Sequence, residues 1–142
     1  MDFSDTSFDP FSAQVVREGT DATIVAYGPL VPVALAAAEA AVEDGRSIEV
    51  IDLRSISPLD VPTVAASVAK TGRLIIAHEA PTFGGMGGEL ASAITERCFY
   101  SLQAPVIRVG GYYMPYPISR VEEEYVPDID RILEAVDRAF DY

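Results

Sequence analysis

The sequence predicts an α/β fold, a three-layer αβα sandwich with about five strands, most of them parallel. Apolar runs of strand length alternate with segments of helical periodicity, and the stretch from Arg73 to Phe99 shows one complete unit. Residues 74–77 form an apolar run typical of a strand buried on both faces, and a glycine-rich turn follows. A helix is then indicated by apolar residues that recur every four positions: Met86, Leu90, Ile94 and Cys98.

The same unit recurs on both sides of this stretch. Further strands are predicted over residues 14–17, 23–27, 48–53 and 106–109. Helices are predicted over residues 31–44, from residues 57–60 to the glycine at 72, and from 127 to 140. Strands that alternate with helices at this spacing form parallel βαβ units, so at most the first strand is expected to run antiparallel, at an edge.

The length and composition indicate one domain over residues 13–142, preceded by a tail or replaced linker over residues 1–12. The net charge of −12 argues against nucleic acid or an anionic membrane as partner; it suits a basic protein partner, or simply keeps the domain soluble. No apolar run approaches the roughly 18 residues of a membrane span. The single cysteine excludes an internal disulfide and favours a reducing, cytoplasmic compartment.

The carboxyl ends of parallel strands share one sheet edge, where open α/β sheets usually bind ligands. Pro29, His78 and Glu79 are expected at this strand-end edge. His78 could act as a general base beside Glu79, but strand neighbours point to opposite faces, and a structural hydrogen bond is the more common role of a lone histidine. The turn FGGMGGEL (83–90) matches no phosphate-binding pattern and contains no Lys or Arg, which favours close packing over phosphate binding.

An aromatic and proline-rich segment, GGYYMPYP (110–117), follows the last predicted strand. Its composition is that of a protein interface, although the rings could instead cover the sheet edge of their own domain. An acidic run comes next, either as part of the same surface or as a solvated turn. The candidate partner-binding residues are Tyr112, Tyr113, Met114, Tyr116, Glu122, Glu123 and Glu124.

Four segments, in order and at natural spacing, resemble one family: IDLRSISPLD (51–60), TGRLIIAHEAPTFGGMGGELA (71–91), MPYP (114–117) and YVPDIDRILEAV (125–136). They are similar to the C-terminal domain of the β subunit of thiamine-diphosphate-dependent 2-oxo acid dehydrogenases, which has the transketolase C-terminal fold. The resemblance covers residues 13–140. The motif HEAP (78–81), followed by a helix ending in ERCF, is most similar to the bacterial branched-chain type.

The resemblance implies a non-catalytic assembly and docking domain. In the parent enzyme, which oxidatively decarboxylates branched-chain 2-oxo acids, thiamine diphosphate and Mg²⁺ bind to other domains, so we expect no catalytic, cofactor-binding or metal-binding residue in this chain. The implied protein partners are the α subunit, a second β subunit and the small basic binding domain of the acyltransferase core. The domain alone is expected to be inactive, and it could self-associate through exposed apolar patches.

Three features depart from the family pattern. Tyr113 stands where an Asp is expected, Pro29 is unusual directly after a strand, and residues 1–12 do not resemble the interdomain linker. They suggest an alternative hypothesis, an engineered binding or design scaffold altered along the strand-end edge. A third hypothesis is an autonomous domain that binds phosphate or another small molecule at the glycine-rich edge, against which the absence of basic residues there counts.

Overall fold

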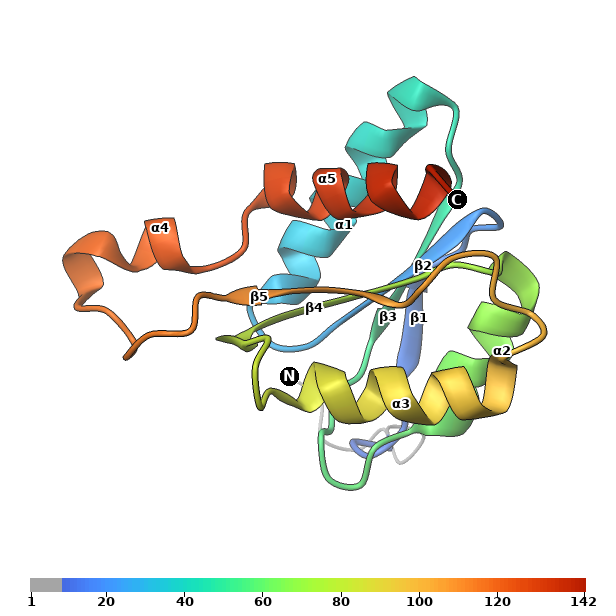
Figure 1. Cartoon of the computed structure of the whole chain (residues 1–142), viewed down its shortest axis with the longest axis horizontal. Helices are drawn as coiled ribbons and strands as arrows, with labels where there is room; N and C mark the ends of the chain where they lie inside the picture. The colour runs from blue at the N-terminus through green and yellow to red at the C-terminus, as the bar shows by residue number, and fades with distance from the viewer. Residues whose placement is uncertain (1–8) are drawn as a thin grey trace, which may run out of the picture.

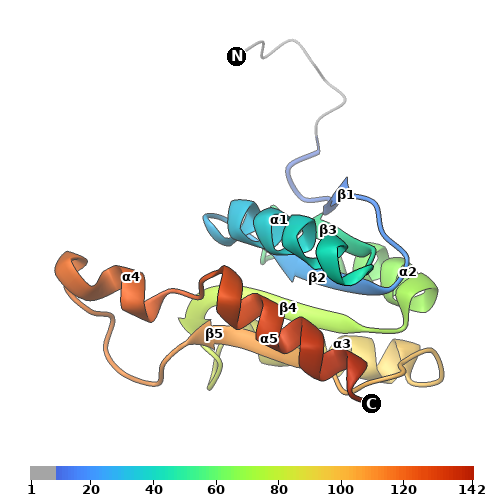
Figure 2. The same cartoon turned by 90° about the horizontal axis from the view of Figure 1, so that it is seen from above.

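The computed structural model describes residues 9–142 and shows a five-stranded sheet between two helical layers (Figures 1 and 2). The first eight residues of the expected tail lie outside the described part. The strands are β1 (Gln14–Arg17), β2 (Ala22–Ala26), β3 (Ile48–Asp52), β4 (Leu74–Pro81) and β5 (Ile107–Gly111). The helices are α1 (Leu30–Ala40), η1 (Ala41–Asp44), α2 (Val61–Thr71), α3 (Met86–Cys98), η2 (Ser119–Val121), α4 (Glu122–Tyr125) and α5 (Ile129–Phe140).

The sheet has the strand order β1-β3-β2-β4-β5. β1 pairs antiparallel with β3, and all other neighbours are parallel. The predicted fold class, including the antiparallel edge strand, is therefore confirmed. Within residues 9–142 no helix is long and apolar enough to cross a membrane.

The helices cover both faces of the sheet, α1 and α5 on one and α2 and α3 on the other (Figure 1). Successive residues of β2 pack against the two helical layers alternately. Ile24 packs on the α1–α5 side and Val25 on the α2–α3 side. Their neighbours on β4, Ile75 and Ile76, divide in the same way. Burial on both faces explains why these strands read as continuous apolar runs.

Two element boundaries differ from the sequence prediction. β4 does not end before His78 but continues to Pro81, because the end of β5 pairs with it, Pro81 opposite Gly111, after a shift in register. A Cβ at Gly111 would lie 2.5 Å from the Glu79 carbonyl oxygen, so only glycine permits this approach. The second helix begins at Val61 rather than at residues 57–60, because the Asp60 side chain caps it by accepting the N–H of Thr63.

A buried carboxylate ties β3 to α2 near the amino ends of the strands. Glu49 is 1% exposed and accepts hydrogen bonds from the Ser67 hydroxyl and the Lys70 ammonium. Ser67 also bonds to the hydroxyl of Thr23, at 2.6 Å. Burial alone would raise the pKa of Glu49, but these hydrogen bonds hold the pKa below the usual glutamate value.

We expect Glu49 to make the fold sensitive to acid. Because its pKa is lower when folded than the usual 4.5, ionised Glu49 stabilises the fold above pH 4.5, and this contribution is lost as the pH falls through the folded pKa. Glu49→Gln should lower the free energy of unfolding at neutral pH by about 1–3 kcal/mol and flatten its decline below pH 4.5. Urea unfolding across this pH range measures both effects.

The control is Glu39→Gln, which breaks the exposed ion pair with Arg17 and should change stability little. Identical pH profiles for Glu49→Gln and the unaltered chain would contradict the assignment.

Candidate functional site

Residues 112–121, here called the aromatic arm, leave the end of β5 and project beyond the carboxyl ends of the strands, with α4 on the return path (Figures 1 and 2). Tyr113 is 79% exposed. The other predicted contact residues on the arm are also more than half exposed: Tyr112, Met114 and Tyr116. Ile118, which sequence analysis did not single out, adds a further exposed apolar side chain.

The arm is held by a buried tyrosine behind it. Tyr112 and Tyr116 contact the ring of Tyr125 edge to face, with centroids 6.3 and 5.1 Å apart. Arg131 lies over the Tyr112 ring at 4.7 Å and donates to the carbonyl oxygens of Tyr125 and Gly110. These rings therefore cover their own domain on one side and remain exposed on the other, and the interface interpretation stays a prediction.

Phe83 extends this apolar surface, and sequence analysis missed it. The side chain is 72% exposed and meets Tyr113 in an edge-to-face contact with ring centroids 4.8 Å apart. It lies in the turn between β4 and α3, where the neighbouring glycines drew attention to the backbone instead. In the sequence, the signal that could have identified this surface was a phenylalanine placed directly before two glycines in a turn, where its side chain is difficult to bury.

The acidic residues of α4 have unequal roles. Glu122 accepts the hydroxyl hydrogen bond of Tyr116, and this bond is the main reason that the pKa of Tyr116 rises to about 12. Glu123 and Glu124 are exposed in the same short helix. An acidic surface therefore adjoins the aromatic arm.

His78 is a packing residue in this structure. It is fully buried, and its Nδ1 lies 2.8 Å from the Ala80 carbonyl oxygen, which can only accept, so this nitrogen carries the proton. Its ring stacks near Tyr27, with centroids 6.3 Å apart. Burial lowers the pKa of His78, and Arg108 lowers it further. No solvent-borne substrate reaches the ring.

The other two strand-end residues have separate positions. Glu79 follows His78 within β4 and is half-buried. Pro29 is exposed and occupies the N-cap of α1 with a helical φ of −67°. Proline with this fixed φ is compatible with the start of a helix, which gives Pro29 a local structural role.

We expect alanine substitutions at two adjacent glycines of the glycine-rich turn to have opposite effects on stability. A Cβ at Gly87 would collide with the ring of His78, whereas a Cβ at Gly88 would meet only the flexible Arg108 side chain, 3.2 Å away. Gly87→Ala should therefore destabilise the fold by about 1–3 kcal/mol. Gly88→Ala, the matched control, should stabilise it by about 0.5–1 kcal/mol through helix propensity.

Chemical unfolding of the two variants under identical conditions measures the difference. Equal stabilities would show that the turn is not packed against His78 as described.

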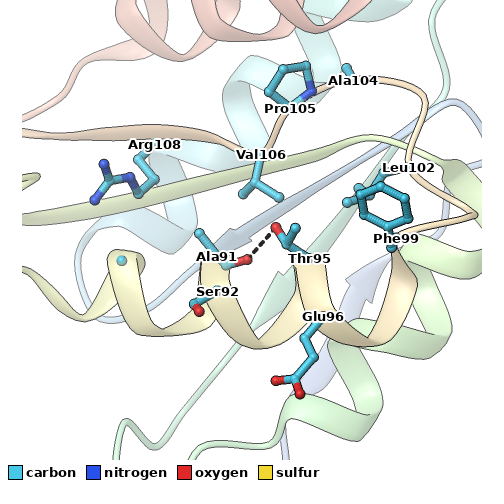
Figure 3. Close-up of a pocket in the computed structure, with 11 residues that line it drawn as sticks. Ala91, Ser92, Thr95, Glu96, Phe99, Leu102, Ala104, Pro105, Val106 and Arg108 are labelled. Carbon is cyan, nitrogen blue, oxygen red and sulfur yellow. Dashed lines mark hydrogen bonds between the residues drawn. The ribbon is translucent and has the colours of Figure 1, made fainter.

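A groove of about 1080 Å³ lies between α3 and the edge strand β5 (Figure 3). Small and apolar side chains line most of it, among them Ala91, Leu102 and Val106. Thr95 turns its hydroxyl back to the Ala91 carbonyl at 2.7 Å, and Glu96 points away from Val106 (Figure 3). The groove is therefore a concave, mainly apolar surface, and the side chains that line it form no catalytic arrangement.

The comparisons with known proteins agree with the fold. The family model of the transketolase C-terminal domain matches residues 12–132, and the chain belongs to this family. Its relatives include β subunits of 2-oxo acid dehydrogenases, as the sequence resemblance predicted.

The pyruvate dehydrogenase E1 component subunit beta of Leifsonia xyli subsp. xyli is 55% identical over 92% of this chain and 39% of that protein. The 3-methyl-2-oxobutanoate dehydrogenase subunit beta of Mycobacterium tuberculosis is 49% identical over 89% of this chain and 36% of that protein. The mitochondrial 2-oxoisovalerate dehydrogenase subunit beta of Dictyostelium discoideum is 47% identical over 92% of this chain and 35% of that protein. The chain thus spans little more than a third of these relatives.

Among solved structures, a split-gene transketolase described as an inactive beta4 tetramer matches with a TM-score of 0.78 and 31% identity. The match covers 96% of this chain and 44% of that chain. The likeness supports the same fold and family.

Within residues 9–142 no group of three or more His, Cys, Asp or Glu is arranged to hold a metal. The glycine-rich turn places Glu89 in the first turn of α3, where a carboxylate repels a diphosphate.

Proposed function

We propose that this chain is a non-catalytic assembly domain of a 2-oxo acid dehydrogenase β subunit, and that its aromatic arm contacts another protein of the complex. The observation that supports the proposal is the contiguous apolar surface of Phe83, Tyr113 and their neighbours on the arm. Exposed aromatic residues of this density mark protein contacts. Because Tyr125 and Arg131 already fix one side of the arm, little conformational entropy remains to be lost on binding.

The partner we favour is the small basic binding domain of the acyltransferase core. Glu123 and Glu124 border the arm, and the chain carries a net charge of −12, so a basic partner is complementary in charge. The α subunit and a second β subunit are the other candidate partners. The beta4 assembly named for the solved split-gene transketolase makes self-association a further outcome to measure.

For the parent enzyme we propose thiamine-diphosphate- and Mg²⁺-dependent oxidation of branched-chain 2-oxo acids, with both cofactors held outside this chain. The sequence motif HEAP at residues 78–81 supports the branched-chain class of enzyme. We expect the complete α and β subunits together to oxidise 3-methyl-2-oxobutanoate faster than pyruvate. A preference for pyruvate, the substrate named for the 55% identical relative, would overturn the class assignment.

Light scattering on the chain, alone and mixed with the basic binding domain, tests the docking proposal. We expect a complex of defined mass that Tyr113→Ala weakens by about tenfold or more, as removal of a central aromatic contact does. Tyr100→Ala is the matched control, because Tyr100 is 99% exposed and lies in the turn after α3, away from the arm. It should leave binding unchanged.

Equal weakening by both substitutions, or no complex with the unaltered chain, would contradict docking through the arm. Tyr113→Asp further separates this proposal from the engineered-scaffold hypothesis. A natural docking surface for a basic partner should bind the Tyr113→Asp variant more tightly than the Tyr113→Ala variant, because the carboxylate adds favourable charge, whereas a surface built around Tyr113 should lose its partner in both.

A further inference from the structure

A cavity of about 300 Å³ lies between α5 and the end of β5, next to the groove, with which it shares Arg108. Three arginines line it: Arg108 from β5, with Arg131 and Arg138 from α5. Thr82 and the backbone of residues 109–113 complete the wall on the β5 side. A second cavity of about 250 Å³ adjoins it and shares Thr82, Arg108 and Arg138.

The three arginines of this cavity make no ion pair within residues 9–142, although the chain has ten basic and 22 acidic residues. Arg108 donates to the neutral carbonyl of Thr82 at 2.9 Å, and Arg131 donates to two further backbone carbonyls. In so acidic a protein, three arginines that make no ion pair and line one concavity form a basic patch that attracts anions.

The charge balance defines the class of anion. Glu134 also lines the cavity, so three guanidinium groups and one carboxylate leave two positive charges. A phosphate group carries nearly two negative charges at neutral pH and presents oxygens that match the guanidinium fork. The volume lies at the small end of ligand sites, which suits a compact ligand.

We propose that this cavity is a phosphate-binding site for inorganic phosphate or a compact phosphate monoester. Arg131 is already fixed by Tyr112 and two carbonyl oxygens, and therefore presents a preorganised edge to the ligand. Arg138 is exposed in the last turn of α5 and has no hydrogen bond within residues 9–142, so it remains available to close on the phosphate. The glycine-rich turn at the start of α3 contains no basic residue of its own but borders the site, since a Cβ at Gly88 would lie 3.2 Å from the Arg108 side chain.

Calorimetric titration of the chain with inorganic phosphate, and separately with glycerol 3-phosphate, tests the proposal at constant ionic strength. We expect saturable binding that Arg138→Ala weakens by about tenfold, because one charge-assisted contact is removed. Arg97→Ala is the matched control, since Arg97 is likewise an exposed arginine in the last turn of a helix but lies on α3. It should bind as the unaltered chain does.

Tyr113→Asp supplies a second test, because it places a carboxylate in the cavity wall and should abolish phosphate binding without removing any arginine. Amide chemical shifts should move at Gly110 and Gly111 on titration and not at Gly19, which lies between β1 and β2. Tighter binding of the monoester would identify it as the ligand, and equal or tighter binding of phosphate would identify the inorganic ion. No saturable binding, or equal binding by Arg138→Ala and Arg97→Ala, would overturn the proposal.

Discussion

The close approach between the ends of β4 and β5 positions every candidate site in this domain. Gly110 and Gly111 lie so near the carbonyl oxygens of Ala80 and Glu79 that any side chain there would collide with them. Because the backbones meet, β4 extends past His78, and β5 directs the chain away from the sheet into the aromatic arm. The same contact brings Thr82 beside Arg108. A bulkier residue at either glycine would displace the arm and the arginine-lined cavity together.

The two ends of the sheet differ in how their charged and aromatic side chains are partnered and exposed. Near the amino ends, Glu49 is buried but fully engaged by Ser67 and Lys70, so that end is internally satisfied. At the carboxyl ends, aromatic rings such as that of Tyr113 remain exposed, and Arg131 makes no ion pair within residues 9–142. The buried polar network thus lies at one end and the proposed recognition surface at the other, where open α/β sheets usually bind ligands.

Local pattern sufficed for the fold but not for the site. Runs such as residues 74–77 and the four-residue spacing of α3 are short-range signals, and they predicted the layers and the antiparallel edge correctly. The extension of β4 depends on glycines about 30 residues later, so no local signal contained it. The contact between Phe83 and Tyr113 is equally non-local. The arginines at 108, 131 and 138 come together only through the packing of α5 on β5.

Arg131 belongs to both proposed binding surfaces and would link them thermodynamically. Its guanidinium group supports Tyr112 at the root of the arm and also lines the cavity. An anion that restrains Arg131 lowers the entropy still to be lost when the arm meets a protein, and the protein does the same for the anion. By reciprocity, each would change the affinity of the other by the same factor. One side chain would thus give the domain a means to report a small-molecule concentration to the proteins bound to it.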